Sequence, residues 1–304
     1  MNTLVPFHGK SIAEAPVTSS SLPLPGPIGQ IGQTVLPFTR TLAVSADGTS
    51  IFLLTQAGIT VVASNFDAPT PIPNVTGIVN GADGGSGIAP GGLALVQGFG
   101  LAPRSESATG LPLPSTLGDA CVTVGNIALP LFRVSPTEVL AQLPFGLTGD
   151  VPLVVRNPGG VSNPFTAHIQ TFAPAIFRSG QAGDQTGLAT VIRQKNGDFV
   201  NFTNPIHPDD VLSIYLTGLS QTSPAAPFGD GAPSDPLAVT ATQPVVTVGN
   251  SSLPILFSGL VPGEVAVYVI NVSVPHGVAS ASQTPLTIKQ GDFSTTLQVR
   301  VVNP

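Results

Sequence analysis

The chain alternates short apolar runs with turn residues, and many of the runs are rich in Val, Ile and Thr. β-Branched residues in short, often alternating segments are typical of β-strands. Pro or Gly recurs too densely for helices, which typically run about 8–20 residues. The pattern therefore predicts an all-β protein, with strands that include residues 122–124, 139–143, 151–155, 266–274 and 296–302.

An internal repeat organises most of the chain. Val122-Thr-Val-Gly-Asn126 recurs as Val246-Thr-Val-Gly-Asn250, and Leu129-Pro130 recurs in the same register as Leu253-Pro254. Ordered matches with only small shifts between them predict two copies of one domain. The further matches pair Gly100-Leu101 with Gly218-Leu219, and Pro136, Glu138 and Val139 with Pro262, Glu264 and Val265.

Each copy holds about seven short strands in about 100 residues with no helix between them, as in an immunoglobulin-like sandwich. A hairpin or three-stranded meander is expected ahead of the two copies, with strands at 42–44, 51–55 and 59–62. We expect tandem immunoglobulin-like β-sandwiches preceded by a β-meander and an extended N-terminal arm. The expected boundaries are a Pro-rich arm at 1–36, the meander at 37–73, sandwich one at 74–173, and sandwich two with its leading connector at 174–304.

These motifs resemble a known family. The two VTVGN…LP…P-x-E-V series, the link Ala173-Pro-Ala-Ile-Phe177 and the strand Tyr215-Leu-Thr-Gly-Leu219 resemble the uncharacterised C-terminal domain of large secreted acidobacterial proteins. Each half is also similar to the immunoglobulin-like fold that plexins and transcription factors share. The resemblance implies export to the cell exterior or surface, makes the meander a remnant of a preceding propeller region, and supplies no catalytic residues.

Composition removes several classes of partner. Charged residues make up only 9% of the chain, the formal net charge is −6, and the 10 Lys and Arg residues form no basic stripe, so we expect no nucleic-acid binding. Gly, Pro, Thr, Ser and Asn interrupt every apolar run, so we expect no transmembrane segment. The first ten residues show no signal-peptide pattern.

No motif predicts a catalytic, cofactor or metal site. The four histidines show no metal-ligand spacing, the acidic turns do not match a calcium loop, and no G-x-S-x-G is present. Glu138 and Glu264 recur because of the duplication, and we interpret them as turn-capping residues rather than a glycosidase pair. Cys121 stands where the second copy has Val245, so we interpret it as a buried small apolar residue.

Two functions remain, and neither is catalytic. The first is a secreted structural protein that assembles with copies of itself, as a filament subunit, because an extended arm can add a strand to a neighbour's sheet. The alternative is a carbohydrate- or surface-binding module that uses the equivalent long loops 102–119 and 220–243, although Trp is absent and Tyr numbers 2. The candidate donor residues of the first hypothesis are Thr3, Leu4, Val5, Pro6, Phe7, Thr34, Val35 and Leu36.

Overall fold

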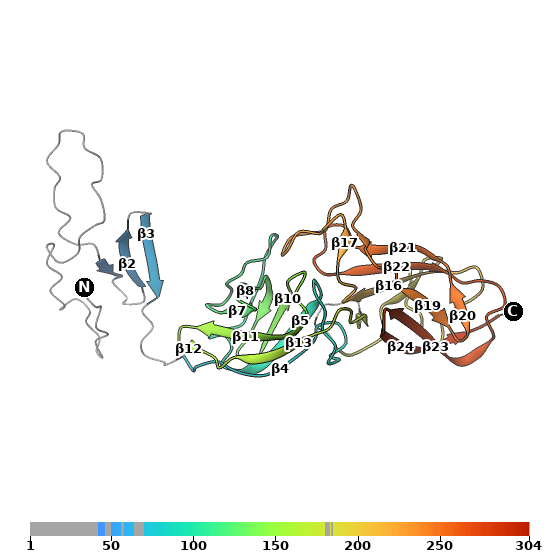
Figure 1. Ribbon diagram of the computed structural model, residues 1–304, viewed down its shortest axis with the longest axis horizontal. Coiled ribbons are helices and arrows are strands. Elements are labelled where there is room, and N and C mark those ends of the chain that lie inside the picture. Colours follow the sequence, from blue (N-terminus) through green and yellow to red (C-terminus); the bar gives the residue numbers. More distant parts are fainter. Residues whose placement is uncertain are drawn as a thin grey trace. The chain divides into compact units, whose positions relative to one another are not determined.

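The computed structural model describes residues 42–45, 50–55, 58–63, 70–179, 183 and 185–303. Every regular element in these ranges is a β-strand (Figure 1). The all-β prediction is therefore confirmed. The chain divides into two compact units, Met1–Pro69 and Thr70–Pro304. Within the described ranges, no helix has the length and apolar character to cross a membrane.

The first unit contains a small antiparallel sheet. Its strands β1 (Leu42–Val44), β2 (Ser50–Thr55) and β3 (Gly58–Ala63) pair in the order β1-β2-β3. This confirms the predicted three-stranded meander. The arm at 1–36, with its eight candidate donor residues, lies outside the described residues, so strand donation from it stays a prediction.

The second unit begins with the first sandwich, whose two sheets enclose one apolar core. Alternation places Val122 and Val124 of β7 opposite Val155 and Leu153 of β11, and all four side chains are fully buried. One sheet has the order β4-β5-β10-β9-β6: β4 (Asn74–Asn80), β5 (Leu93–Phe99), β6 (Glu106–Ser107), β9 (Leu131–Val134) and β10 (Glu138–Gln142). The other has the order β12-β11-β7-β8, with β13 also on β11: β7 (Cys121–Val124), β8 (Ile127–Ala128), β11 (Gly149–Asn157), β12 (Gly160–Val161) and β13 (Phe165–Ile169).

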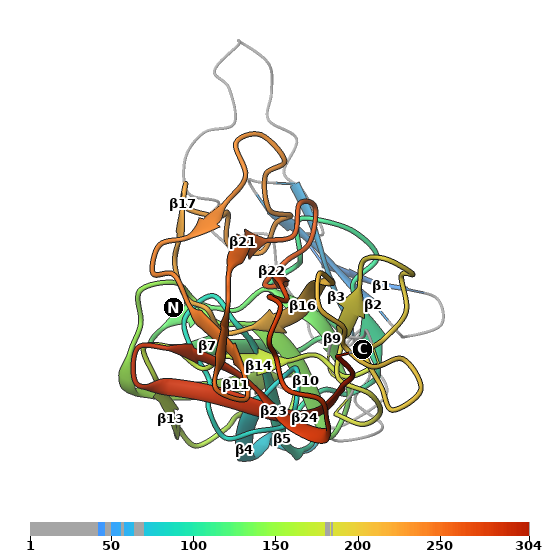
Figure 2. The ribbon, with the colours of Figure 1, turned by 90° about the vertical axis from the view of Figure 1, so that its right-hand side faces the viewer.

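The second sandwich repeats this topology, which shows the tandem immunoglobulin-like arrangement. Figure 2 shows the sheet of β16, β21 and β22 above the sheet of β23 and β24. The larger sheet has the order β14-β16-β22-β21-β18-β17, with β15 also on β16: β14 (Ala175–Ile176), β15 (Val191–Arg193), β16 (Val211–Thr217), β17 (Thr222–Ser223), β18 (Val239–Thr240), β21 (Ile255–Leu260) and β22 (Tyr268–Ser273). The smaller has the order β20-β19-β23-β24: β19 (Val245–Val248), β20 (Ser251–Leu253), β23 (Ala281–Gln290) and β24 (Phe293–Val301).

The repeated Gly-Leu pair ends the same strand in both sandwiches. Gly100 follows β5 and Gly218 follows β16, and both have positive φ angles of 61° and 82°. Glycine adopts this left-handed conformation without the steric cost of a side chain. The turn then directs Leu101 and Leu219 into their cores, where both are fully buried. The motif is therefore a structural device of the fold.

The two sandwiches share a third apolar cluster. It combines Ala82 and Leu93 of the first sandwich with Ala175, Phe177, Val265 and Ala266 of the second. A buried hydroxyl bridges the two sides: Leu93 N donates to Thr217 Oγ1 at 3.1 Å, and Thr217 Oγ1 donates to the Ala266 carbonyl at 2.8 Å. The contact between the sandwiches is thus built like a domain core, with its polar groups paired.

Replacing Thr217 with valine keeps the shape of this side chain but removes both hydrogen bonds. The Leu93 N–H and the Ala266 carbonyl would then be buried without these partners, so we expect the free energy of unfolding to fall by about 1–3 kcal/mol. Denaturant unfolding of the full chain measures this loss. Thr287→Val on β23 is the control, because its hydroxyl meets only Thr296 Oγ1 at an exposed position. Equal losses in both variants would contradict a special role for Thr217.

Candidate functional site

The two long loops that the sequence marked for ligand binding contact each other. Leu113 N, in the loop of the first sandwich, donates to the Gly229 carbonyl of the second at 2.6 Å. Gly229 N donates in turn to Oε1 of the buried Gln142 at 2.8 Å. The central parts of both loops therefore hold the sandwiches together. The start of the first loop, residues 103–107, stays exposed.

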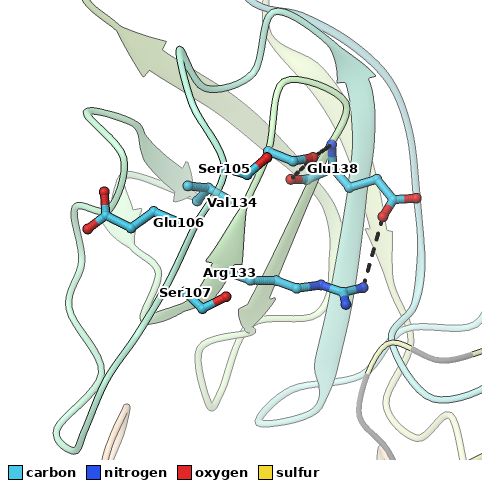
Figure 3. Close-up of a pocket in the computed structure, with 7 residues that line it drawn as sticks. Ser105, Glu106, Ser107, Arg133, Val134 and Glu138 are labelled. Atoms are coloured by element: carbon cyan, nitrogen blue, oxygen red, sulfur yellow. Dashed lines mark hydrogen bonds and ion pairs between the residues drawn. The ribbon is translucent and has the colours of Figure 1, made fainter.

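A polar hollow lies at that start, beside the short edge strand β6. It has a volume of about 380 Å³ and is lined by three serines, two glutamates, one arginine and one valine. The ladder places these side chains together, because β6 pairs with β9 through Glu106–Val134 and Ser107–Arg133, and β9 pairs with β10. Figure 3 shows the Arg133 side chain reaching toward Glu138, while Glu106 points the other way. The lining residues are Ser105, Glu106, Ser107, Arg133, Val134, Ser135 and Glu138.

Each carboxylate of the hollow has a guanidinium partner. Arg133 Nη2 lies 3.9 Å from Glu138 Oε2 and donates to the Gly183 carbonyl at 3.3 Å. Arg104 Nε donates to Glu106 Oε2 at 3.2 Å, and the same guanidinium is hydrogen-bonded to Asp119. The bond with Asp119 raises the pKa of Arg104. Because the charges are paired locally, the hollow offers donors and acceptors without a strong field of either sign.

A serine-capped turn fixes the far wall of the hollow. Ser135 Oγ accepts from Glu138 N at 2.9 Å and from Thr137 N at 3.2 Å, so β9 is tied to the start of β10. The interpretation of Glu138 as a turn-capping residue is therefore wrong: Ser135 caps the turn, and the Glu138 carboxylate faces Arg133. Glu264, its match in the sequence repeat, does not take the same place in the ladder: Glu138 lies opposite Gln97, whereas Val269 lies opposite Tyr215, the residue equivalent to Gln97. Glu264 is instead exposed in a turn where its N–H donates to the Val261 carbonyl at 3.1 Å.

The hollow belongs to the first sandwich alone. β9 and β21 have a register shift at the same place, after Leu131 and after Ile255, so Arg133 corresponds to Phe257. The second copy thus lacks the guanidinium that organises the site. The sequence analysis did not single out Arg133, because it compared only the positions at which the two copies have the same residue. A signal was nevertheless present. Lys and Arg number only 10 in the chain, and this arginine has no match in the second copy.

The histidines stay apart from this site. His168 Nδ1 lies 2.7 Å from Asp150 Oδ1, and His276 Nε2 lies 3.1 Å from Asp209 Oδ1, both at exposed positions. Within the described ranges, no three His, Cys, Asp or Glu residues gather in a way that could hold a metal ion. Of the four histidines, only His8 falls outside those ranges.

Burial is the main cause of the pKa shift at two other titratable groups. Cys121 is only partly buried on β7, and desolvation raises the pKa of its thiol, with Arg156 acting in the opposite direction. The Tyr268 hydroxyl donates to the Ser220 carbonyl inside the second core, and burial raises its pKa well above the ordinary value. Neither group lines the hollow.

No family model and no curated protein matches this chain. Solved structures give weak matches. A Bacteroides ovatus surface glycan-binding protein, SGBP-B, in complex with a mixed-linkage heptasaccharide is 12% identical over 84% of this chain and 53% of its own, with a TM-score of 0.34. A xyloglucan-locus SGBP-B from Bacteroides uniformis is 13% identical over 76% and 49%, with a TM-score of 0.24. The I9–I11 tandem of titin is 6% identical over 84% and 74%, with a TM-score of 0.21. The chain spans about half the length of the two glycan-binding proteins, and we draw nothing about function from likenesses this weak.

Proposed function

We propose that the chain is a non-catalytic module of the cell exterior that binds a neutral, hydroxyl-rich saccharide in the hollow of the first sandwich. The observation that supports this is the pairing of Arg133 with Glu138, and of Arg104 with Glu106, around three serines. Sugar hydroxyls both donate and accept, so they match carboxylates, guanidinium groups and serines together. A volume of about 380 Å³ lies in the range of small-molecule sites.

Charge pairing argues against the competing ligands. A phosphate or a carboxylate ligand in the hollow would meet the negative charges of Glu106 and Glu138, and a cation would meet the positive charge of Arg133. An uncharged ligand avoids both of these like-charge repulsions. Hydrolysis of a glycoside needs two carboxyl groups that flank the scissile bond, whereas Glu138 is turned toward Arg133 and Glu106 points the other way (Figure 3). Binding without turnover is therefore the function that this geometry supports best.

Binding can be measured by calorimetry after a screen of neutral polysaccharides and their oligosaccharides, with mixed-linkage glucan among the probes. We expect saturable binding by the full chain, and at least a tenfold weaker affinity for Arg133→Met, equal to about 1.4 kcal/mol. Methionine keeps the length of the side chain but removes its donors. The matched control is Arg156→Met, an exposed arginine of the same sandwich outside the hollow, which should bind like the wild type.

Two results would contradict the proposal. One is that no neutral saccharide binds the full chain. The other is that Arg133→Met binds as tightly as Arg156→Met while both unfold at the same denaturant concentration. Release of reducing ends during prolonged incubation would overturn the non-catalytic part of the proposal.

A further inference from the structure

β24 is an edge strand with a long unpaired side. It lies outermost in the sheet β20-β19-β23-β24, and it pairs with β23 along its length (Figures 1 and 2). On its other side the described residues supply one neighbour, Ile206, at the C-terminal end. Ile206 N donates to the Arg300 carbonyl at 2.9 Å, and Val302 N donates to the Ile206 carbonyl at 2.9 Å. Among the described residues, no strand lies beside the stretch of β24 before Arg300.

The bond to Ile206 identifies which backbone groups face outward. In an antiparallel sheet, successive residues direct their N–H and C=O groups to alternate sides. Because the Arg300 carbonyl points away from β23, the same groups of Ser294, Thr296 and Gln298 also point away from it. These three residues are exposed, whereas Leu297 and Val299 lean on the core of the sandwich. Three residues therefore present free donors and acceptors in a row.

The edge lacks the features that usually prevent strand pairing. Such features include lysine, proline, a bulge or a very short strand. The sequence Ser294-Thr-Thr-Leu-Gln298 carries no charge and no proline, and the register shift of this hairpin lies on β23. The equivalent edge strand of the first sandwich, β13, follows Pro164 and has 5 residues against 9 in β24. Of these two equivalent edges, the one in the second copy is thus the longer and more open.

We propose that β24 pairs with β24 of a second copy of this chain, antiparallel and about a two-fold axis at Thr296. This register sets Thr296 opposite itself and Ser294 opposite Gln298, so all three outward residues of both copies are used. It forms about six backbone hydrogen bonds, two for each of three pairs.

Neighbouring registers pair fewer of the outward-facing backbone N–H and C=O groups. Moving the axis to Leu297 places Ser294 opposite Arg300, whose carbonyl already accepts from Ile206. Moving it to Thr295 places Gln298 opposite Asp292 in the two-residue turn between β23 and β24. The two-fold pair at Thr296 is therefore the arrangement that the free groups select. An isologous contact of this kind closes with two copies.

The first test changes the residue on the axis. Thr296→Lys sets two like charges against each other, which opposes pairing. In sedimentation velocity over a concentration series, the wild type should pass from monomer to dimer and Thr296→Lys should stay monomeric. Ser252→Lys, at the opposite edge of the same sheet, is the matched control and should dimerise like the wild type. Circular dichroism checks that all three proteins are folded.

The second test determines the register of the two β24 strands by disulfide cross-linking. In a Cys121→Val background, Thr296→Cys should oxidise to a covalent dimer, because directly opposed residues have Cα atoms about 5.5 Å apart, within reach of a disulfide. Ser294→Cys should not, since its two copies lie roughly 13 Å apart along the strands in this register. A wild type that stays monomeric at every concentration overturns the proposal. So does dimerisation in which the Thr296→Cys and Ser294→Cys proteins cross-link equally, or in which neither does, because the edge then has another occupant.

The results of the sedimentation and cross-linking tests do not depend on saccharide binding. The hollow lies in the first sandwich and β24 lies in the second. Thr296→Lys should therefore bind saccharide with the affinity of each wild-type site. Failure of the calorimetry and failure of the cross-linking can be told apart.

Discussion

Asp210→Ala is expected to lower the free energy of unfolding by about 3–5 kcal/mol, because it leaves a buried guanidinium without its partner. Arg193 Nε and Nη2 donate to the two carboxylate oxygens of Asp210 at 2.7 and 2.8 Å. His207 N also donates to Asp210 Oδ2 at 2.7 Å. The two side chains are only 10% and 3% exposed, so water cannot replace the lost contacts. Denaturant unfolding of the full chain measures the loss.

The neighbouring residue supplies the control. Asp209 carries the same carboxylate and pairs with His276 at 3.1 Å, but both side chains are more than 70% exposed. An exposed pair contributes little, so Asp209→Ala should cost less than about 1 kcal/mol. The double variant Arg193→Met with Asp210→Leu should recover part of the loss, since removing both charges leaves none unpaired. Similar losses for the two single variants would contradict the assignment.

Gly218→Ala is expected to lower the free energy of unfolding by about 2–5 kcal/mol. The φ angle of 82° costs a residue with a Cβ about 1–2 kcal/mol. A Cβ at this position would also overlap the Ala173 carbonyl oxygen and lie 2.7 Å from the carbonyl carbon. The backbone has to move to relieve that contact, which adds about 1–3 kcal/mol. Ala173 N donates to the Gly218 carbonyl at 2.9 Å, so the movement also disturbs this bond.

Gly263→Ala separates the two causes of this loss. Gly263 has nearly the same φ, 78°, but nothing lies within 4 Å of a Cβ built there. We expect it to show the conformational cost alone, measured by the same denaturant unfolding. If both variants lose the same stability, the contact with Ala173 has no effect and the close approach of these two segments is unimportant.

The strands could be predicted because their signal is local. Alternation in Val122-Thr-Val124 and the β-branched run of residues 151–155 specify half-buried strands without reference to the rest of the chain. The repeat predicted the number of sandwiches, since motifs that recur in the same order imply the same topology. Strand boundaries depend on local turns that the pattern does not reveal. The strand expected at 266–274 is Tyr268–Ser273, because Ala266 has a positive φ of 59° and turns the chain before the ladder begins.

The hollow and the buried ion pair could not be predicted, because they depend on contacts between distant segments. Ser107 and Arg133 meet only when β6 pairs with β9, and no local pattern marks a strand of 2 residues. Arg193 and Asp210 are 17 residues apart, and no sequence pattern distinguishes this pair from any other acidic and basic residue of the chain. Loops 102–119 and 220–243 were correctly seen as equivalent, but their mutual contact through Leu113 and Gly229 is a property of the assembled pair.

The apolar cluster shared by the sandwiches makes each half dependent on the other. Expressed separately, the first half would expose Leu93 and the second would expose Phe177, both nearly fully buried in the whole. Full exposure of one such side chain costs about 1.5–3 kcal/mol. Thr217 and Gln142 would also lose partners across the divide. Each of the duplicated domains thus gains stability from the other, so excising or exchanging one of them lowers the stability of the domain that remains.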